Sequence, residues 1–282
     1  MNKLFAAVII LISTFLIVTS CKKNDVTGTG DNTGSGTGSV TDTIVTNTKD
    51  TLFSNAVIIK FTDTSATVTN PFAGAGVTVT VSKADVTVTS TITSTEIYYV
   101  LSGNCSNGMF KLYSDYKFNL VFNGVGLTNT DGPAVNIQSS KKVTVLVLNN
   151  TNNRLIDGST YASSTEDQKG AFFSEGQLNF TGYGTLTVKG KYKHAICSDG
   201  YIYVKEGNII VPEAVSDAIH ANDYFKMDAG SINATSSGDG IDCEKGYVNI
   251  NGGNITVASV DDGITASYDG TDATIIPYLL IK

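Results

Sequence analysis

The stretch SGDGIDCEKGYVNINGGNITVASVDDGI, residues 237–264, contains two copies of one short unit. Asp-Gly-Ile begins at Asp239 and again at Asp262, 23 residues later, and a related Asp-Ala-Ile begins upstream at Asp217. After each unit come short segments in which apolar and polar residues alternate, such as YVNI and NITV. Alternation of this kind is typical of β-strands with one buried face. The stretch therefore indicates a repeat built from short strands.

The repeat extends upstream at a nearly constant spacing. Glycines that precede an apolar alternating segment stand 23 residues apart, at Gly184, Gly207, Gly230 and Gly253. Small residues recur at spacings of 24, 23, 22 and 23, at Ala171, Ala195, Ala218, Gly240 and Gly263. Three short strands per period, without helices, are typical of a parallel β-helix. We expect an all-β fold, a single-stranded right-handed parallel β-helix with coils of about 23 residues.

Inward-facing residues of successive coils should form apolar columns, because neighbouring parallel strands lie about 4.8 Å apart. The first expected column is Phe172, Ile196, Ile219, Ile241 and Ile264; the second is Leu178, Ile202, Phe225 and Val248; the third is Leu186, Ile209, Ile232 and Ile255. Residues 149–170 interrupt the rhythm and are interpreted as an excursion from one coil. The terminal ATIIPYLLIK is expected to form a cap or a last strand.

The amino terminus predicts export. A lysine at position 3 precedes an apolar run from Leu4 to Val18 and small residues that end at Cys21. Val18-Thr19-Ser20-Cys21 resembles a bacterial lipobox, which implies cleavage before Cys21 and lipidation of its thiol. A plain signal peptide or an anchor helix is the alternative. We expect a lipoprotein signal peptide at 1–21, a flexible Gly/Thr/Ser-rich tether at 22–50, and a β-helix domain at 51–282.

Charge and the cysteine and histidine content argue against several functions and kinds of site. The net charge of −7 and the lack of a basic face argue against nucleic-acid binding. With Cys21 lipidated, three cysteines remain, and an odd number argues against a disulfide framework. The coil register separates Cys197 from Cys243 by two strands, so both are expected to be free thiols. Two histidines, His194 and His220, are too few to predict a histidine-based transition-metal site.

The coils also carry a family resemblance. The succession LVFNGVGLTNTDGPAVNIQSSKKVTV, GAFFSEGQLNFTGYGTLTVKG, DAIHAND and GDGIDCEKGYVNINGGNITVASVDDGITA resembles secreted bacterial carbohydrate-binding β-helix lipoproteins. That family is similar to family 9 pectate lyases in fold and calcium sites, and some members bind polygalacturonate and cellulose. The resemblance implies a lipid-anchored protein of the bacterial outer membrane or cell surface that binds such plant-type polysaccharides.

The recurring aspartates predict a metal site. Asp217, Asp239 and Asp262 precede equivalent Ala/Gly-Ile units, so they occupy one corner of three consecutive coils, and Asp242 and Asp261 add two carboxylates. Like charges one strand apart repel by roughly 1 kcal/mol in water and by more where solvent is excluded. Calcium takes six to eight oxygen ligands and would relieve this repulsion. The alternative is that each aspartate bonds backbone amides of its own turn.

A tyrosine column offers a second candidate surface. If Ile202, Phe225 and Val248 point inward, then Tyr201, Tyr224 and Tyr247 point outward, one coil apart. We interpret the phenol rings as a platform on which a sugar could lie, although such a ladder can also serve sheet stability alone.

Three functions fit these features. The first is a calcium-dependent carbohydrate-binding protein of the cell surface. Its partner is a polysaccharide, and one form of this hypothesis takes that polysaccharide to be acidic and to contain uronate. The second is an adhesive or structural surface protein. The third is a calcium-dependent pectate lyase, which needs a basic residue beside the metal; Lys226 and Lys245 lie on the relevant coils but in no recognisable motif.

Overall fold

The computed structural model describes residues 53–282, and every named element within this range is a β-strand. The expected signal peptide, the tether and Cys21 lie outside the described residues. Among residues 53–282 there is no helix with the length and apolar character needed to cross a membrane.

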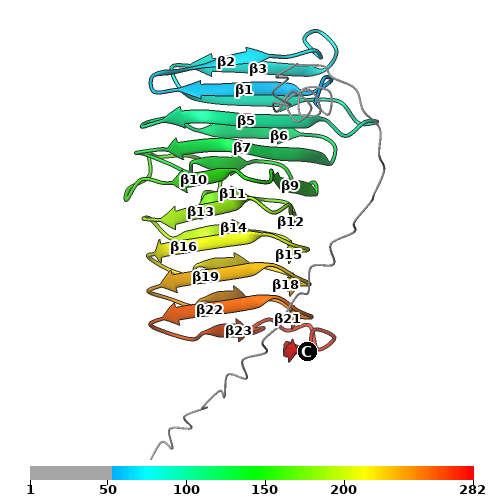
Figure 1. Cartoon of the computed structure of the whole chain (residues 1–282). Helices are drawn as coiled ribbons and strands as arrows, with labels where there is room; N and C mark the ends of the chain where they lie inside the picture. The colour runs from blue at the N-terminus through cyan, green and yellow to red at the C-terminus, as the bar shows by residue number, and fades with distance from the viewer. Residues whose placement is uncertain (1–52) are drawn as a thin grey trace, which may run out of the picture. The chain divides into compact units, whose positions relative to one another are not determined.

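The described chain coils into a right-handed parallel β-helix, as expected (Figure 1). A nine-stranded sheet forms one wall, and its parallel strands are β4 (Asp85–Ser90), β6 (Phe110–Ser114), β8 (Val135–Ile137), β11 (Gly170–Ser174), β14 (His194–Ser198), β17 (Ile219–Ala221), β20 (Ile241–Cys243) and β23 (Ile264–Ala266). Its remaining strand, β3 (Val77–Ser82), pairs antiparallel with β4.

A fifteen-stranded sheet forms the other two walls as two rows joined through β7 (Phe118–Thr128). The first row contains β9 (Val143–Val147), β12 (Leu178–Thr181), β15 (Ile202–Val204), β18 (Tyr224–Met227), β21 (Tyr247–Ile250) and β24 (Tyr278–Ile281). The second row contains β10 (Asn152–Ile156), β13 (Thr185–Gly190), β16 (Asn208–Ala214), β19 (Ser231–Ser236) and β22 (Asn254–Ser259).

The three predicted apolar columns are the core. In the nine-stranded sheet, Phe172 pairs with Ile196, and the register continues to Ile219, Ile241 and Ile264 at intervals of 24, 23, 22 and 23 residues. The other two columns also follow the expected register. Their members are almost all fully buried, and each such side chain contributes about 1.5 to 3 kcal/mol of transfer free energy.

Both ends depart from the regular coil. At the amino end, β1 (Val57–Thr62) pairs antiparallel with β2 (Ser65–Thr69) and parallel with β5 (Tyr98–Cys105), which pairs in turn with β7. At the carboxyl end, β24 pairs in parallel with β21, so the prediction of a last strand from ATIIPYLLIK is confirmed.

The predicted excursion over residues 149–170 is too long. Asn152–Ile156 forms β10, a regular third strand, and only 157–169 leaves the coil. The sequence misled because Asn153 stands where the column has Leu186. Its amide group makes this polar position tolerable: Oδ1 accepts hydrogen bonds from the backbone amides of Gly124 and Val125 at 2.9 and 3.0 Å. Buried polar groups are stable when they are paired in this way.

The cysteines of the described chain are free, which confirms the expectation for Cys197 and Cys243. Cys243 belongs to the interior core, whereas Cys197 is buried on the other side of the same sheet.

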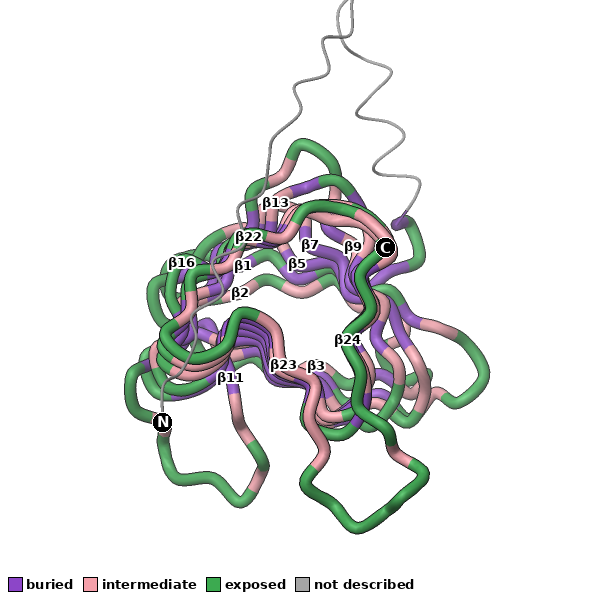
Figure 2. Tube along the Cα trace, turned by 90° about the horizontal axis from the view of Figure 1, so that it is seen from below, coloured by how far each residue is buried: buried purple, intermediate pink, exposed green. Residues whose placement is uncertain are grey.

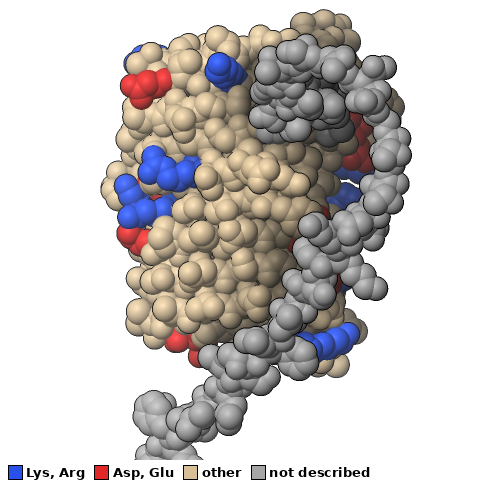
Figure 3. Space-filling view, viewed as in Figure 1, with Lys and Arg blue, Asp and Glu red and all other residues tan. Residues whose placement is uncertain are grey.

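The outer face of the second row carries few charged side chains (Figure 3). Polar uncharged residues align across its strands, and the amide of Asn208 bonds Thr185 at 2.8 Å and Ser231 at 2.7 Å. The carboxylates considered below belong to the coil corner that leads into the nine-stranded sheet instead.

Candidate functional site

The corner that leads into the nine-stranded sheet carries one four-residue unit per coil. The units are HAIC (194–197), DAIH (217–220), DGID (239–242) and DGIT (262–265). The isoleucine of each faces the core, and the last residues pair across strands as Cys197, His220, Asp242 and Thr265. Backbone hydrogen bonds align the first residues, His194, Asp217, Asp239 and Asp262. Each coil therefore brings two side chains, three residues apart, to one polar ladder.

The aspartates in the first column of this ladder hold the next coil. Oδ1 of Asp217 accepts a hydrogen bond from the backbone amide of Asp239 at 2.9 Å, and Oδ1 of Asp239 accepts one from the amide of Asp262, also at 2.9 Å. These bonds join neighbouring coils, over 22 and 23 residues, so they differ from the alternative in which each aspartate bonds backbone amides of its own turn. They occupy one oxygen of each carboxylate and leave its charge in place.

The five predicted metal ligands form two groups. Asp217 and Asp242 converge on Nδ1 of His220, with their Oδ2 atoms 3.2 and 2.9 Å away. The other three, Asp239, Asp261 and Asp262, each offer an oxygen atom within 4.8 Å of the others. The ladder thus contains an acid–histidine cluster and, at its carboxyl side, an acid-only cluster.

The acid–histidine cluster has its own charge balance. Burial acts to lower the pKa of His220, but the Asp217 and Asp242 carboxylates raise it to about 9. Burial acts to raise the pKa of Asp217, but hydrogen bonds from His194 and His220 hold it well below its usual range. Burial and the nearby charge of His220 keep the pKa of His194 low. At neutral pH the cluster therefore holds an imidazolium ion at His220 and a neutral imidazole at His194 beside the ionised Asp217.

The acid-only cluster lacks such compensation. Partial burial raises the pKa of Asp239, and the charges of Asp217 and Asp242 raise it further. Asp261 and Asp262 are exposed. A bound cation would stabilise these three carboxylates together, because nearby opposite charge favours the ionised form.

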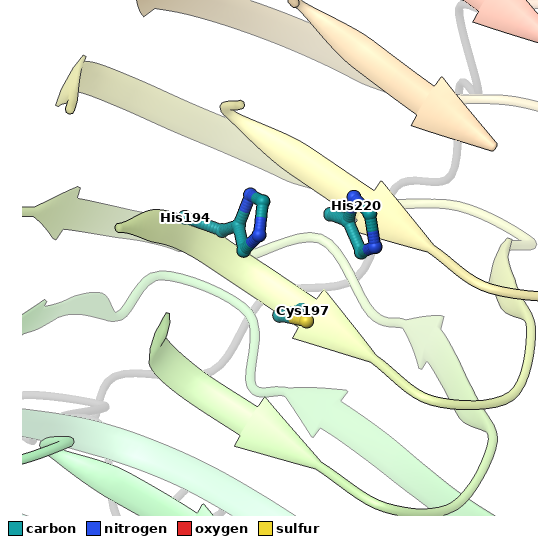
Figure 4. Close-up of side chains that lie close together, drawn as sticks. All are labelled: His194, Cys197 and His220. Carbon is teal, nitrogen blue, oxygen red and sulfur yellow. The ribbon is translucent and has the colours of Figure 1, made fainter. Parts of the chain in front are cut away.

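Three side chains that the sequence interpretation set aside also converge. His194, Cys197 and His220 are buried, and each offers a ligand atom within 4.8 Å of the others (Figure 4). The sequence did contain the signal: HAIC and DAIH occupy the same unit as DGID, so their end residues share the ladder. A count of the two histidines alone missed this group. Its third member is Cys197, which the register of the coils places next to His220.

The tyrosine column is present and longer than expected. Tyr201, Tyr224, Tyr247 and Tyr278 stack with ring centroids 4.5, 4.9 and 4.9 Å apart and interplanar angles of 11°, 3° and 4°. The inner rings therefore cover each other's faces. At Tyr224 and Tyr247 a sugar can therefore meet ring edges and hydroxyl groups, whereas the end rings Tyr201 and Tyr278 have one stacking neighbour each.

Two loops project on the side of the nine-stranded sheet (Figure 2). One comprises residues 157–169, where Glu166 forms an ion pair with Lys111 at 2.6 Å. The other comprises 267–277, and with the end of the sheet it forms an open pocket of about 540 Å³. The pocket is lined by Asp242, Glu244, Lys245, Ser267, Tyr268, Asp269, Gly270 and Ile275. The polar ladder thus leads into a sugar-sized recess.

Comparison with known proteins assigns the chain. A family model described as carbohydrate-binding domain-containing protein matches residues 82–275, which include the whole ladder. The chain belongs to this carbohydrate-binding family. The resemblance expected from the coil motifs is thereby confirmed.

One sequence relative and one solved structure are similar to this family member. A carbohydrate-binding domain-containing protein of Acetivibrio thermocellus is 27% identical over 118 residues, which cover 40% of this chain and 41% of the relative. The chain thus matches about two fifths of the length of that curated relative. A solved polysaccharide lyase-like protein from C. thermocellum, in a gadolinium derivative, superposes with a TM-score of 0.66 at 24% identity. That match covers 80% of this chain and 97% of the other, and it confirms the fold.

The tyrosine column allows a direct test of structural against binding roles. Tyr247→Ala in this carbohydrate-binding protein is expected to lower the free energy of unfolding by about 1 to 2 kcal/mol, because it interrupts a continuous stack. Tyr247→Phe keeps the ring and should change stability by less than about 0.5 kcal/mol. Denaturant unfolding measures both. If Tyr247→Phe weakens polysaccharide binding at unchanged stability, the hydroxyl edge contacts sugar; if it does not, the column serves the sheet.

Proposed function

We propose that the protein binds a uronate-containing polysaccharide, such as polygalacturonate, on the outer face of the nine-stranded sheet, and that calcium is required. The observation that carries the proposal is the convergence of Asp239, Asp261 and Asp262 within 4.8 Å in a chain of a carbohydrate-binding family. An all-carboxylate cluster suits a hard cation, and calcium prefers six to eight oxygen ligands. Three aspartates leave positions for the oxygens of a sugar.

Charge supports an ion-bridged mode of binding. The protein has a net charge of −7, and a polyuronate is also anionic, so direct contact with the acidic corner is unfavourable. A calcium ion shared between the aspartates and a sugar carboxylate would reverse this repulsion. The pocket beside the ladder supplies a cation at Lys245 and an aromatic ring at Tyr268 for the same chain of sugars.

A lyase is the competing function. Its two candidate bases, Lys226 and Lys245, lie in different parts of the structure. Lys226 lies in β18 with Nζ 3.3 Å from Asp228 and 4.6 Å from the ring centroid of Tyr203, on the first row. Lys245 lines the pocket with Asp242. Of the two, Lys245 is the one beside the polar ladder, next to Asp242 of the acid–histidine cluster. Binding without cleavage is the function we propose, since a lysine there also suits uronate recognition.

Calcium titration tests the metal. Chelator-treated protein is expected to bind calcium in calorimetry, and Asp261→Asn with Asp262→Asn should weaken binding at least about ten-fold, because two charged ligands are lost. These side chains are exposed, so the double variant should fold. Asp228→Asn, at the corner between β18 and β19, is the matched control and should bind as the parent does. Equal binding by both variants, or no binding by the parent, would contradict the proposed site.

Polysaccharide binding is tested separately. Polygalacturonate in an electrophoresis gel should retard the protein with calcium and not with chelator, while the double variant should migrate unretarded. Retardation that persists in chelator would overturn the calcium requirement, and adsorption to cellulose alone would overturn the uronate. Appearance of ultraviolet-absorbing unsaturated sugars would assign a lyase, and Lys245→Ala should then abolish them.

The proposed setting is the bacterial cell surface. The support is the lipobox-like Val18–Cys21 and the apolar run before it. Cys21→Ser is expected to move the protein from the membrane fraction to the soluble fraction of cells. Unchanged membrane association of Cys21→Ser would contradict the lipid anchor.

A further inference from the structure

The ladder has a nitrogen- and sulfur-bearing end that the calcium proposal does not use. His194 and Cys197 lie at the first and fourth positions of β14, and His220 is the middle residue of the neighbouring β17. The imidazole rings stack with centroids 4.3 Å apart at an angle of 24°, and Cys197 lies beside them (Figure 4). The side chains of His194 and His220 are only 3% and 7% exposed, and Cys197 is fully buried.

Asp217 orients both rings. Its Oδ2 lies 3.0 Å from Nδ1 of His194 and 3.2 Å from Nδ1 of His220. Nδ1 of His194 also lies 3.4 Å from the backbone amide of Asp217, but the carboxylate is closer, and two acceptors at 3.0 Å would repel. We therefore assign the proton of His194 to Nδ1, which leaves a lone pair on the other ring nitrogen, Nε2. A carboxylate that holds a histidine in this tautomer is the usual neighbour of a metal-binding imidazole.

The lone pair of His194 has no partner. Nε2 of His194 is a buried side-chain atom without a hydrogen bond within the described chain. Leaving a buried polar atom unpaired is unfavourable, so such an atom needs an explanation. A ligand that accepts this lone pair would supply one.

We propose that His194, Cys197 and His220 form a binding site for a divalent transition metal of the zinc class, separate from the calcium cluster. Two imidazoles and a thiolate are ligands that zinc selects and calcium avoids. Tetrahedral zinc places its ligand atoms about 3.5 Å apart, so atoms now within 4.8 Å need to close by about 1 Å. Binding releases two protons to solvent, one from the Cys197 thiol and one from the His220 imidazolium, and the fourth position is left for water.

Burial distinguishes this site from a solvent-exposed chance cluster. All three ligands come from strands in the middle of the β-helix, and the chain on either side is held by ladders to β11 and β20. Rigid strands position ligands more accurately than loops do. The acid-only cluster, in contrast, has two exposed members. The two sites therefore differ in ligand chemistry and in accessibility, and they should select different metals.

Cobalt titration tests the proposal, because cobalt(II) takes zinc sites and reports its ligands by colour. Chelator-treated protein with cobalt is expected to show sulfur-to-metal charge-transfer absorption in the near ultraviolet, which zinc then removes. Cys197→Ser should abolish this band and weaken zinc binding by at least about 100-fold. Cys243→Ser is the matched control, since this buried free thiol faces the core, and it should leave both unchanged.

Further variants keep the test decisive. If Cys197→Ser does not fold, as judged by circular dichroism, His194→Gln takes its place and should also lose zinc affinity while the thiol band weakens. Absence of any band in the parent, or a band that survives Cys197→Ser, would overturn the site. Loss of zinc affinity in Asp261→Asn with Asp262→Asn would assign the metal to the acid-only cluster instead. Calcium binding by Cys197→Ser should be unchanged, so either site can fail without the other.

Discussion

Gly230→Ala is expected to lower the free energy of unfolding by about 3 kcal/mol or more. Gly230 lies in the turn between β18 and β19 with φ of +96°, a conformation that other residues rarely adopt. A methyl group there would lie 2.2 Å from the carbonyl oxygen and 2.6 Å from the amide nitrogen of Gly207, one coil away. The neighbour is backbone and cannot move without separating two coils. At Gly230, glycine is therefore required by the close approach of successive turns.

A second glycine separates backbone strain from collision. Gly74 also has a positive φ, +76°, but a methyl group there would meet nothing within 4 Å. Gly74→Ala should cost only about 1 to 2 kcal/mol. Equilibrium unfolding in denaturant, with circular dichroism at matched protein concentration, measures both. Equal losses in the two variants would show that the coil contact at Gly230 relaxes at no cost.

The second large effect is a loss of stability in alkali caused by His220. The folded pKa of His220 is about 9, against an unfolded value of about 6.5. A group whose pKa is raised by folding stabilises fully below its unfolded pKa and loses that stabilisation as pH rises through the folded value. Metal-free protein should therefore lose about 3 kcal/mol between pH 6.5 and 9.5. The groups that face this imidazole are Asp217, Asp242, Glu244 and His194.

Asp217 causes the corresponding loss of stability in acid. Its pKa is depressed by folding, so its stabilisation is present above the unfolded value of about 3.9 and is lost as pH falls through the folded value. Both contributions are complete only between about pH 4 and 6.5. Asp217→Ala should cost about 3 kcal/mol in this window, because it leaves His220 without one carboxylate and the Asp239 amide without its acceptor.

The two histidines provide the matched comparison. His220→Gln should remove most of the decline between pH 6.5 and 9.5, measured as denaturant midpoints in chelator. His194→Gln should leave the decline intact, because the pKa of His194 is lowered and this group is neutral throughout that range. A decline that persists in His220→Gln would show that another group is responsible.

The core could be predicted because its rule is local and repetitive. An inward residue in a parallel β-helix must align with its equivalent in the next coil, so Ile196, Ile219 and Ile241 had to share a column once their spacing was seen. The same rule failed at Asn153, where a polar residue occupies an inward position and is paired by backbone amides of the preceding coil. Pairing of this kind depends on a neighbour 28 or 29 residues away and has no local signature.

The site could be predicted only in part. Sequence spacing placed Asp217, Asp239 and Asp262 at one corner, and the structure agrees. It could not show that Asp217 turns toward two imidazoles while Asp239 joins Asp261 and Asp262, because side-chain direction at a corner depends on what the adjoining coil presents. The tyrosines are a similar case. Their spacing predicted the column, but the parallel stacking of the rings, which covers the faces of the inner ones, results from packing one coil on the next.

The sequence alone determined the coil length, the three strands, the inward columns and the acidic corner, since each is a consequence of period and alternation along the chain. Only the tertiary structure decided how the polar residues divide: five acids into two clusters, and two histidines with one cysteine into a third group of a different chemistry. The physical reason is that strand register is set by backbone hydrogen bonds, which repeat, whereas the partner of each charged side chain is set by distance, burial and charge across coils, which do not.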